Sequence, residues 1–159
     1  MKIAFLTGLV AAVLCGYLHF AVLTGIAGIG GFLYYSPLLI YFASIYFSMK
    51  RNATVNHGGQ IEFKQAIKYG GITALIVCIG ILIGFYVGLT HFDVIGQYKS
   101  NVAEGMSKED ISFILKSYTG PVMFDRAKYF TFPYFLLGFI VTVGCAFVIK
   151  LFQAKRKSG

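Results

Sequence analysis

The chain opens with a long apolar tract, residues 3–47, that contains no Asp, Glu, Lys or Arg. As a single helix this tract would be roughly 68 Å long at about 1.5 Å per residue, whereas the hydrocarbon core of a bilayer is only about 30 Å thick. The tract therefore has to turn back, and the glycine cluster in residues 25–31 marks the place, because glycines interrupt helices. We expect two membrane spans here, at about residues 3–23 and 30–47, the second containing Pro37.

Two further apolar runs follow, at about residues 69–90 and 130–152, and each has about the 20 residues that a spanning helix needs. Pro133 falls in the first turn of the last span, where proline is tolerated. Hydrophobic residues make up 57% of the chain and charged residues 13%, against about 45–50% and about 25% in soluble domains. The predicted fold is an all-α membrane protein with four transmembrane helices, in which residues 1–159 form one integral membrane domain.

The first span could instead be a cleaved signal peptide, because Lys2 precedes an apolar stretch. Its apolar run continues well past the length of a signal-peptide core, and Leu14 precedes Cys15, where lipoprotein processing requires a small residue. We therefore expect the first span to remain in the protein. The three cysteines, Cys15, Cys78 and Cys145, form no CxxC pair and no metal-ligand spacing, so we interpret them as small packing residues.

A polar segment at residues 48–68 separates the second and third spans. After Gly58 and Gly59, apolar residues recur at helical spacing, with two lysines on the opposite side. The residues concerned are Phe63, Ala66, Ile67, Lys64 and Lys68. We expect a short amphipathic helix that lies in the membrane interface and leads into the third span.

The segment between the third and fourth spans, residues 91–129, is long for a connector, since helix–helix connections usually take about 2–8 residues. Ser107 precedes acidic residues and resembles a helix N-cap, and the Thr-Gly-Pro run at residues 119–121 ends the predicted helix. The apolar face of this helix consists of Ile111, Ile114, Leu115 and Tyr118. With an earlier amphipathic piece at residues 93–103, it predicts a small outer helical cap that contacts either the end of the bundle or another protein.

The charges divide unequally between the two sides of the predicted bundle. Both termini and residues 48–68 share one side, which carries nine Lys and Arg against one acid, whereas residues 91–129 carry five of each. The whole net charge of +8 therefore lies on one side, and the positive-inside rule places both termini in the cytoplasm. Attraction to anionic lipid headgroups adds to this bias. Because topology and lipid attraction account for the excess of basic residues, we expect no nucleic-acid partner.

Neither a catalytic set nor a cofactor or metal site is evident in the sequence. The interiors of the spans lack Asp, Glu, Lys and Arg, which inside a membrane are usually functional. His19, near the outer end of the first span, is either a functional histidine or a side chain that reaches water or a carbonyl group. His91 and Asp93 form an HxD pair without an evident third metal ligand, and Asp125 is expected at the level of lipid headgroups. No HExxH, GxSxG, Walker or dinucleotide-binding pattern occurs.

Three of the predicted spans carry small residues four positions apart, a spacing that lets helix backbones approach closely. These ridges are Gly8, Ala12 and Gly16 in the first span, Gly80, Gly84 and Gly88 in the third, and Gly138, Thr142 and Ala146 in the fourth. The ridges either pack within the bundle of this chain or dock a different membrane protein.

Residues 50–71, KRNATVNHGGQIEFKQAIKYGG, resemble the signature of a family of small four-span inner-membrane proteins. That family occurs mainly in Bacteroidetes-type bacteria and is filed as a domain of unknown function. The matching residues are Gly58, Gly59, Ile61, Phe63, Ala66 and Gly70. The charged outer loop and the basic residues 155–157 are also similar to that family. The resemblance covers nearly the whole chain and implies an inner-membrane location and a four-span topology, but no activity.

The sequence favours a non-enzymatic accessory or scaffold subunit of a bacterial inner-membrane complex, with the bilayer, anionic headgroups and another inner-membrane protein as partners. The alternative is a small lipid-linked carrier or flippase-like helper, for example for polyprenyl-linked sugars. A polar cavity between the spans, open to lipid, would favour that alternative. An enzyme that uses the outer loop is a third class, which convergence of His91, Asp93 and Asp125 in one pocket would favour. No cofactor is expected.

Overall fold

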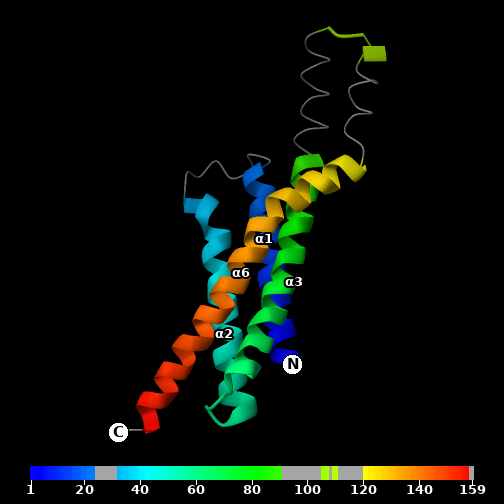
Figure 1. Ribbon diagram of the computed structural model, residues 1–159. Helices are drawn as coiled ribbons and strands as arrows, with labels where there is room; N and C mark the ends of the chain where they lie inside the picture. The colour runs from blue at the N-terminus through cyan, green and yellow to red at the C-terminus, as the bar shows by residue number, and fades with distance from the viewer. Residues whose placement is uncertain (24–31, 91–104, 108, 111–119, 158–159) are drawn as a thin grey trace.

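The computed structural model describes residues 1–23, 32–90, 105–107, 109–110 and 120–157 (Figure 1). Within these ranges the chain is helical and contains no strand. The long helices are α1 (Lys2–Leu23), α2 (Phe32–His57), α3 (Phe63–Leu89) and α6 (Gly120–Lys157).

Three helices of the described part of the chain, α1, α3 and α6, are long and apolar enough to cross a membrane. This confirms an all-helical, membrane-embedded protein. The fourth expected span, α2, is not among them, although it has 26 residues. Its apolar residues alternate with tyrosines and serines, and its last two turns are polar, which lowers its mean hydropathy.

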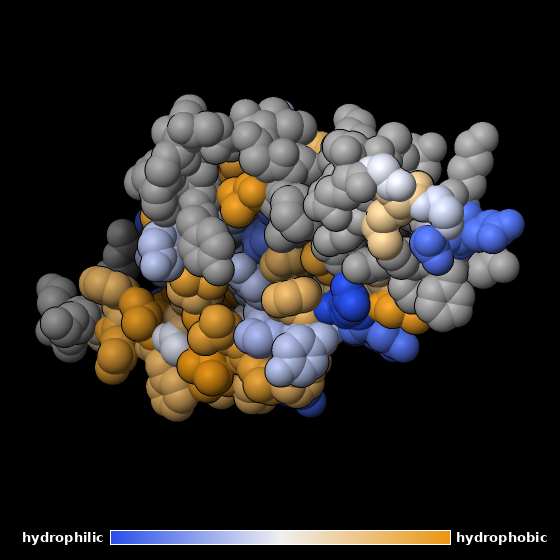
Figure 2. Space-filling view, turned by 90° about the horizontal axis from the view of Figure 1, so that it is seen from above, coloured by the Kyte–Doolittle hydropathy of each residue, from blue (hydrophilic) through white to orange (hydrophobic). Residues whose placement is uncertain are grey.

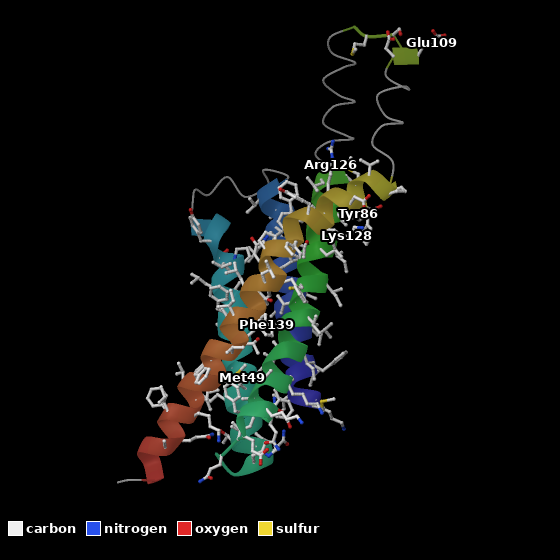
Figure 3. All side chains as sticks on the ribbon, viewed as in Figure 1. Met49, Tyr86, Glu109, Arg126, Lys128 and Phe139 are labelled. Carbon is white, nitrogen blue, oxygen red and sulfur yellow. The ribbon has the colours of Figure 1, made fainter. Side chains whose placement is uncertain are left out.

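Successive helices run in opposite directions along the bundle. The N-terminus, the turn between α2 and α3, and the C-terminal part of α6 therefore lie at the same end (Figure 1). We call this the basic end, because it carries the described cations Lys2, Lys50, Arg51, Lys64, Lys68 and Lys150. Arg126 and Lys128 lie at the opposite end (Figure 3).

The helices α1 and α3 are in direct backbone contact through their small-residue ridges. A Cβ atom added to Gly80 would lie 2.6 Å from the Cβ of Ala12, and one added to Gly84 would lie 2.7 Å from the Cα of Gly16. A Cβ on Gly16 would in turn meet the Gly80 carbonyl oxygen. The ridges of these two helices thus face one another inside the bundle, which is the arrangement that small residues permit.

The ridge of α6 also packs within the bundle. A Cβ atom on Gly138 would collide with the hydroxyl group of Tyr41 from α2. Thr142 and Ala146 are almost completely buried, and the Thr142 methyl group lies against Gly70 of α3. The structure therefore places all three ridges against helices of the same chain.

The turn between α2 and α3 is shorter than the sequence indicated. Gly58 and Gly59 have positive φ angles of 58° and 86°, so the reversal is complete by Glu62, whose backbone N–H donates to Gln65 Oε1 at 3.4 Å. The expected separate interfacial helix is absent from the described residues. Phe63 and the residues that follow it instead form the first turns of α3, because the two glycines make the whole reversal.

Those first turns have one apolar and one polar side, as predicted. Ala66 is fully buried, whereas Lys64 and Lys68 are exposed. The ring of Phe63 lies 4.9 Å from that of Phe147 in α6, and Ile67 packs against the core. The apolar side of these turns therefore contacts α6 and the core.

Helix α6 begins ten residues before the predicted span. Gly120 and Pro121 were expected to end a preceding helix, but they open α6, because proline is also favoured in a first turn. Pro133 consequently lies inside the helix and not in its first turn. Proline removes a backbone hydrogen bond and bends helices, and α6 changes direction near this point, after its first turns have crossed the end of α3 (Figure 1).

Only the start of the predicted outer cap falls within the described residues. The backbone N–H of Asp110 donates to Ser107 Oγ at 3.1 Å, which confirms Ser107 as an N-cap. The predicted contact face lies outside the described residues: Ile111, Ile114, Leu115 and Tyr118.

Candidate functional site

A groove of about 460 Å³ runs between α2 and α6 at the basic end. Helix α2 contributes one face of its last turns, and these residues are Tyr46, Lys50, Ala53 and Thr54. Helix α6 contributes Ile149, Phe152 and Gln153, and Gly59 of the α2–α3 turn completes the wall. We call this cavity the α2–α6 groove.

The groove has an apolar side and a polar side. Its apolar side includes Phe152, which is 64% exposed, and the ring of Tyr46. Its polar side includes Lys50, whose ammonium nitrogen lies 5.9 Å from the centroid of that ring. An ammonium group in front of an aromatic face is stabilised by the ring quadrupole, which holds the charge at the mouth of the groove.

Two hydrogen bonds fix the neutral polar groups of the groove. Thr54 Oγ1 donates to the Lys50 carbonyl oxygen at 3.1 Å. Gln153 Nε2 donates to the Gly59 carbonyl oxygen at 3.2 Å, and this bond ties α6 to the turn between α2 and α3. The Gln153 amide is therefore held in place on the wall that both elements share.

A second groove, of about 430 Å³, shares Gln153 with the first and is lined by Gln60, Phe147, Lys150, Leu151, Gln153 and Ala154. We call it the α6 side groove. Glu62 is the only acid among the described residues of the basic end, and it is exposed. Both grooves therefore lie in a positive field that attracts anionic headgroups.

His19 is buried between helices, where its ring reaches a backbone carbonyl group. It is 6% exposed, and its ring packs against that of Phe85 at a centroid distance of 4.6 Å. Its Nδ1 lies 2.7 Å from the Cys15 carbonyl oxygen, and its Nε2 lies 2.9 Å from Tyr134 Oη. Because a carbonyl oxygen only accepts, Nδ1 carries the proton and donates. This histidine joins α1 to α6.

Tyr41 occupies the centre of the bundle. It is fully buried, donates to the Tyr134 carbonyl oxygen at 3.2 Å, and lies 3.3 Å from Cys78 Sγ. Cys15 Sγ donates to the Pro37 carbonyl oxygen at 3.4 Å. Both cysteines are buried and free, so they act as packing residues with one polar contact each.

A third polar contact joins three helices nearer the basic end. Thr73 Oγ1 of α3 lies 2.8 Å from Ser48 Oγ of α2 and 3.2 Å from the Ala4 carbonyl oxygen of α1. Side-chain hydrogen bonds between membrane helices contribute about 0.6 kcal/mol on average. These contacts hold α2 and α1 against α3 near the basic end.

Of the remaining candidates from the sequence, the structure describes Asp125 alone. Among the described residues, no group of three or more His, Cys, Asp or Glu side chains gathers. His91 and Asp93 lie outside the described residues. Asp125 is exposed and pairs with Lys128 at 2.6 Å, and an exposed pair of this kind stabilises a fold by about 0–1 kcal/mol.

The sequence reasoning missed the residues of the α2–α6 groove. Their spacing was available as a signal, since Tyr46, Lys50, Ala53 and Thr54 share one helical face. The pairing of that face with α6 is a tertiary feature that the spacing does not contain.

No protein-family model, no curated protein and no solved structure matches this chain. The resemblance to the four-span bacterial family is therefore a hypothesis. The helices themselves define the class of protein. It is a membrane-embedded helical protein with a groove that has an apolar side and a basic polar side.

Proposed function

We propose that this chain is a non-enzymatic lipid-binding protein of the bacterial inner membrane, acting as a small carrier or flippase-like helper for lipids with anionic headgroups. The α2–α6 groove is the observation that supports this function. It combines a lysine with an apolar wall, and it opens between helices at the basic end. A headgroup phosphate would pair with Lys50 while the hydrocarbon chain lies along Phe152.

The proposal includes four spans, with α2 as the fourth. A helix of 26 residues is about 39 Å long, enough to cross the hydrocarbon core. Tyr41, Ile45 and Met49 of α2 are fully buried in the bundle, so α2 runs alongside the three apolar helices. With the basic end in the cytoplasm, both termini are cytoplasmic, and Lys64 and Lys68 lie at headgroup level.

The groove is tested by lipid retention on the purified protein. Lys50→Gln should weaken binding of phosphatidylglycerol roughly fivefold, because a lysine near an anionic surface contributes about 1 kcal/mol. Lys64→Gln is the matched control, since Lys64 is exposed at the same end but outside the groove. Native mass spectrometry from mixed-lipid nanodiscs measures the bound lipid. Equal loss in both variants would show that the surface charge and not the groove attracts lipid.

An accessory subunit is the second candidate, supported by the exposed face of α6. Most of α6 is not covered by the rest of the bundle, and its large apolar residues include Phe132, Phe135, Phe139 and Ile140, each at least 49% exposed. Phe139 lies about midway along α6 (Figure 3). Seen from the end opposite the basic end, apolar side chains also cover the flank of the bundle (Figure 2).

A photoreactive group at Phe139 separates the two candidates. Mild extraction from native cells after illumination should give adducts with lipid and a monodisperse monomer if the face contacts only the bilayer. A crosslinked second protein, in a particle heavier than the monomer, would instead favour the accessory subunit and its inner-membrane partner.

A further inference from the structure

The two grooves at the basic end have a wall residue in common. Among the described residues, Gln153 alone lines both the α2–α6 groove and the α6 side groove. The volumes are similar, about 460 Å³ and about 430 Å³. Gln153 is thus common to two cavities of nearly equal size.

Among the described residues, each groove has one lysine and an apolar wall of its own. Lys50 serves the α2–α6 groove beside Phe152, and Lys150 serves the α6 side groove beside Leu151. All four side chains are exposed, with Phe152 at 64% and Leu151 at 65%. Each groove therefore combines a cation with an exposed apolar side chain, and Gln153 lies on the wall of both.

The Gln153 amide, on the wall that both grooves share, is held in position. Gln153 Nε2 uses one N–H on the Gly59 carbonyl oxygen at 3.2 Å. An amide group has two N–H donors and a carbonyl acceptor. The second N–H and Oε1 therefore remain for a hydroxyl group placed between the cavities.

Resting on the proposed function, we propose that the two grooves together bind one lipid whose headgroup holds two phosphates joined by a short hydroxyl-bearing bridge, the chemistry of cardiolipin. One phosphate pairs with Lys50 and the other with Lys150, while the bridging hydroxyl bonds to Gln153. Basic pockets between membrane helices on the cytoplasmic side suit such headgroups. A lipid with one phosphate fills only one of the two grooves.

The prediction is a preference for cardiolipin over phosphatidylglycerol at equal total phosphate. Linking two binding groups makes the second contact intramolecular, so we expect a preference of about tenfold or more. Lys50→Gln and Lys150→Gln should each reduce the affinity for cardiolipin to the affinity for phosphatidylglycerol. Gln153→Leu should reduce the preference, and Lys64→Gln should leave it unchanged. Native mass spectrometry measures retention, and thermal unfolding of each variant shows that it folds.

The outcomes separate this inference from the function on which it rests. The protein could bind cardiolipin and phosphatidylglycerol equally, with Lys50→Gln as the one substitution that weakens both. That result would overturn the paired site and leave the proposed function standing. Loss of cardiolipin preference in Lys64→Gln as well would overturn the paired site, because total charge would then explain it. Absence of binding of either lipid by the folded protein would overturn the proposed function itself.

Discussion

Gly84 shows how much of this bundle depends on the absence of a side chain. A Cβ atom there would meet the backbone of Gly16 in α1, and backbone, unlike the end of a flexible side chain, cannot move aside locally. Gly71 in the same helix has no atom within 4 Å of its Cβ position. A larger side chain is therefore excluded at Gly84 and has room at Gly71 of the same helix.

Gly84→Leu should lower the free energy of unfolding by about 3 kcal/mol or more, since overpacking usually costs about 1–3 kcal/mol even where side chains can adjust. Leu82→Ala removes a half-buried side chain and should cost about 1–2 kcal/mol, below the range for fully buried leucines. Gly71→Leu is the size-matched control and should cost nothing. Thermal unfolding in detergent compares the three, and equal stability of Gly84→Leu and Gly71→Leu would contradict the α1–α3 contact.

The bond between His19 and Tyr134 links α1 to the bent helix α6. His19→Phe and Tyr134→Phe each leave the other partner without this bond, His19 buried and Tyr134 half-buried, whereas the double variant removes both polar ends. The double-mutant cycle should therefore show a coupling energy of about 0.6–1.7 kcal/mol. Unfolding in detergent of the four proteins measures it. Additive effects would mean that the bond between His19 and Tyr134 contributes nothing to stability.

At the scale of elements, the centres of the helices could be predicted from the sequence, whereas their ends could not. Runs of uncharged apolar residues mark the centres of the helices, because such a run is stable as a helix in hydrocarbon whichever other helices it packs against. The ends of α2, α3 and α6 depend on local choices that one sequence leaves open. Gly120 and Pro121 can stop one helix or start the next, and Gly58 and Gly59 can form a long link or a tight turn.

The candidate groove was still less accessible to sequence reasoning. It lies where the end of α6 packs beside α2 and Gln153 bonds to the turn at Gly59. Gln153 belongs to no motif, and its contact with Gly59 spans 94 positions of the chain. The basic end itself could be predicted, because a charge count needs only the order of the spans.

The first turns of α3 should lie at the membrane boundary with two different environments. Phe63 faces the ring of Phe147 and is half-buried, whereas Lys64 is exposed. Spin labels at these two positions, in a variant without native cysteines, should differ clearly in accessibility to a water-soluble relaxation agent, with the label at Lys64 the more accessible. Equal accessibility of both labels would mean that these turns stand free in water.

At the scale of the whole molecule, the number of spans decides on which side each loop lies. The structure places the α2–α3 turn and both chain ends at the basic end, and four spans with cytoplasmic termini require all three in the cytoplasm. If α2 did not cross the membrane, the turn near Gly58 would lie outside, Gly105 inside and the C-terminus outside. The two topologies therefore give opposite locations at every one of these points.

Alkaline phosphatase fusions test the topology, because this enzyme is active only outside the cytoplasm. With four spans, a fusion after Gly105 should be active, whereas fusions after Gly58 and after Gly159 should be inactive, since the net charge of +8 lies on their side. A cytoplasmic reporter such as green fluorescent protein at the same points should give the reverse pattern and controls for expression. Activity after Gly58 and Gly159 with none after Gly105 would show three spans, and would place the phosphate-binding lysines of α2 and α6 outside the cytoplasm, where the positive-inside rule disfavours them.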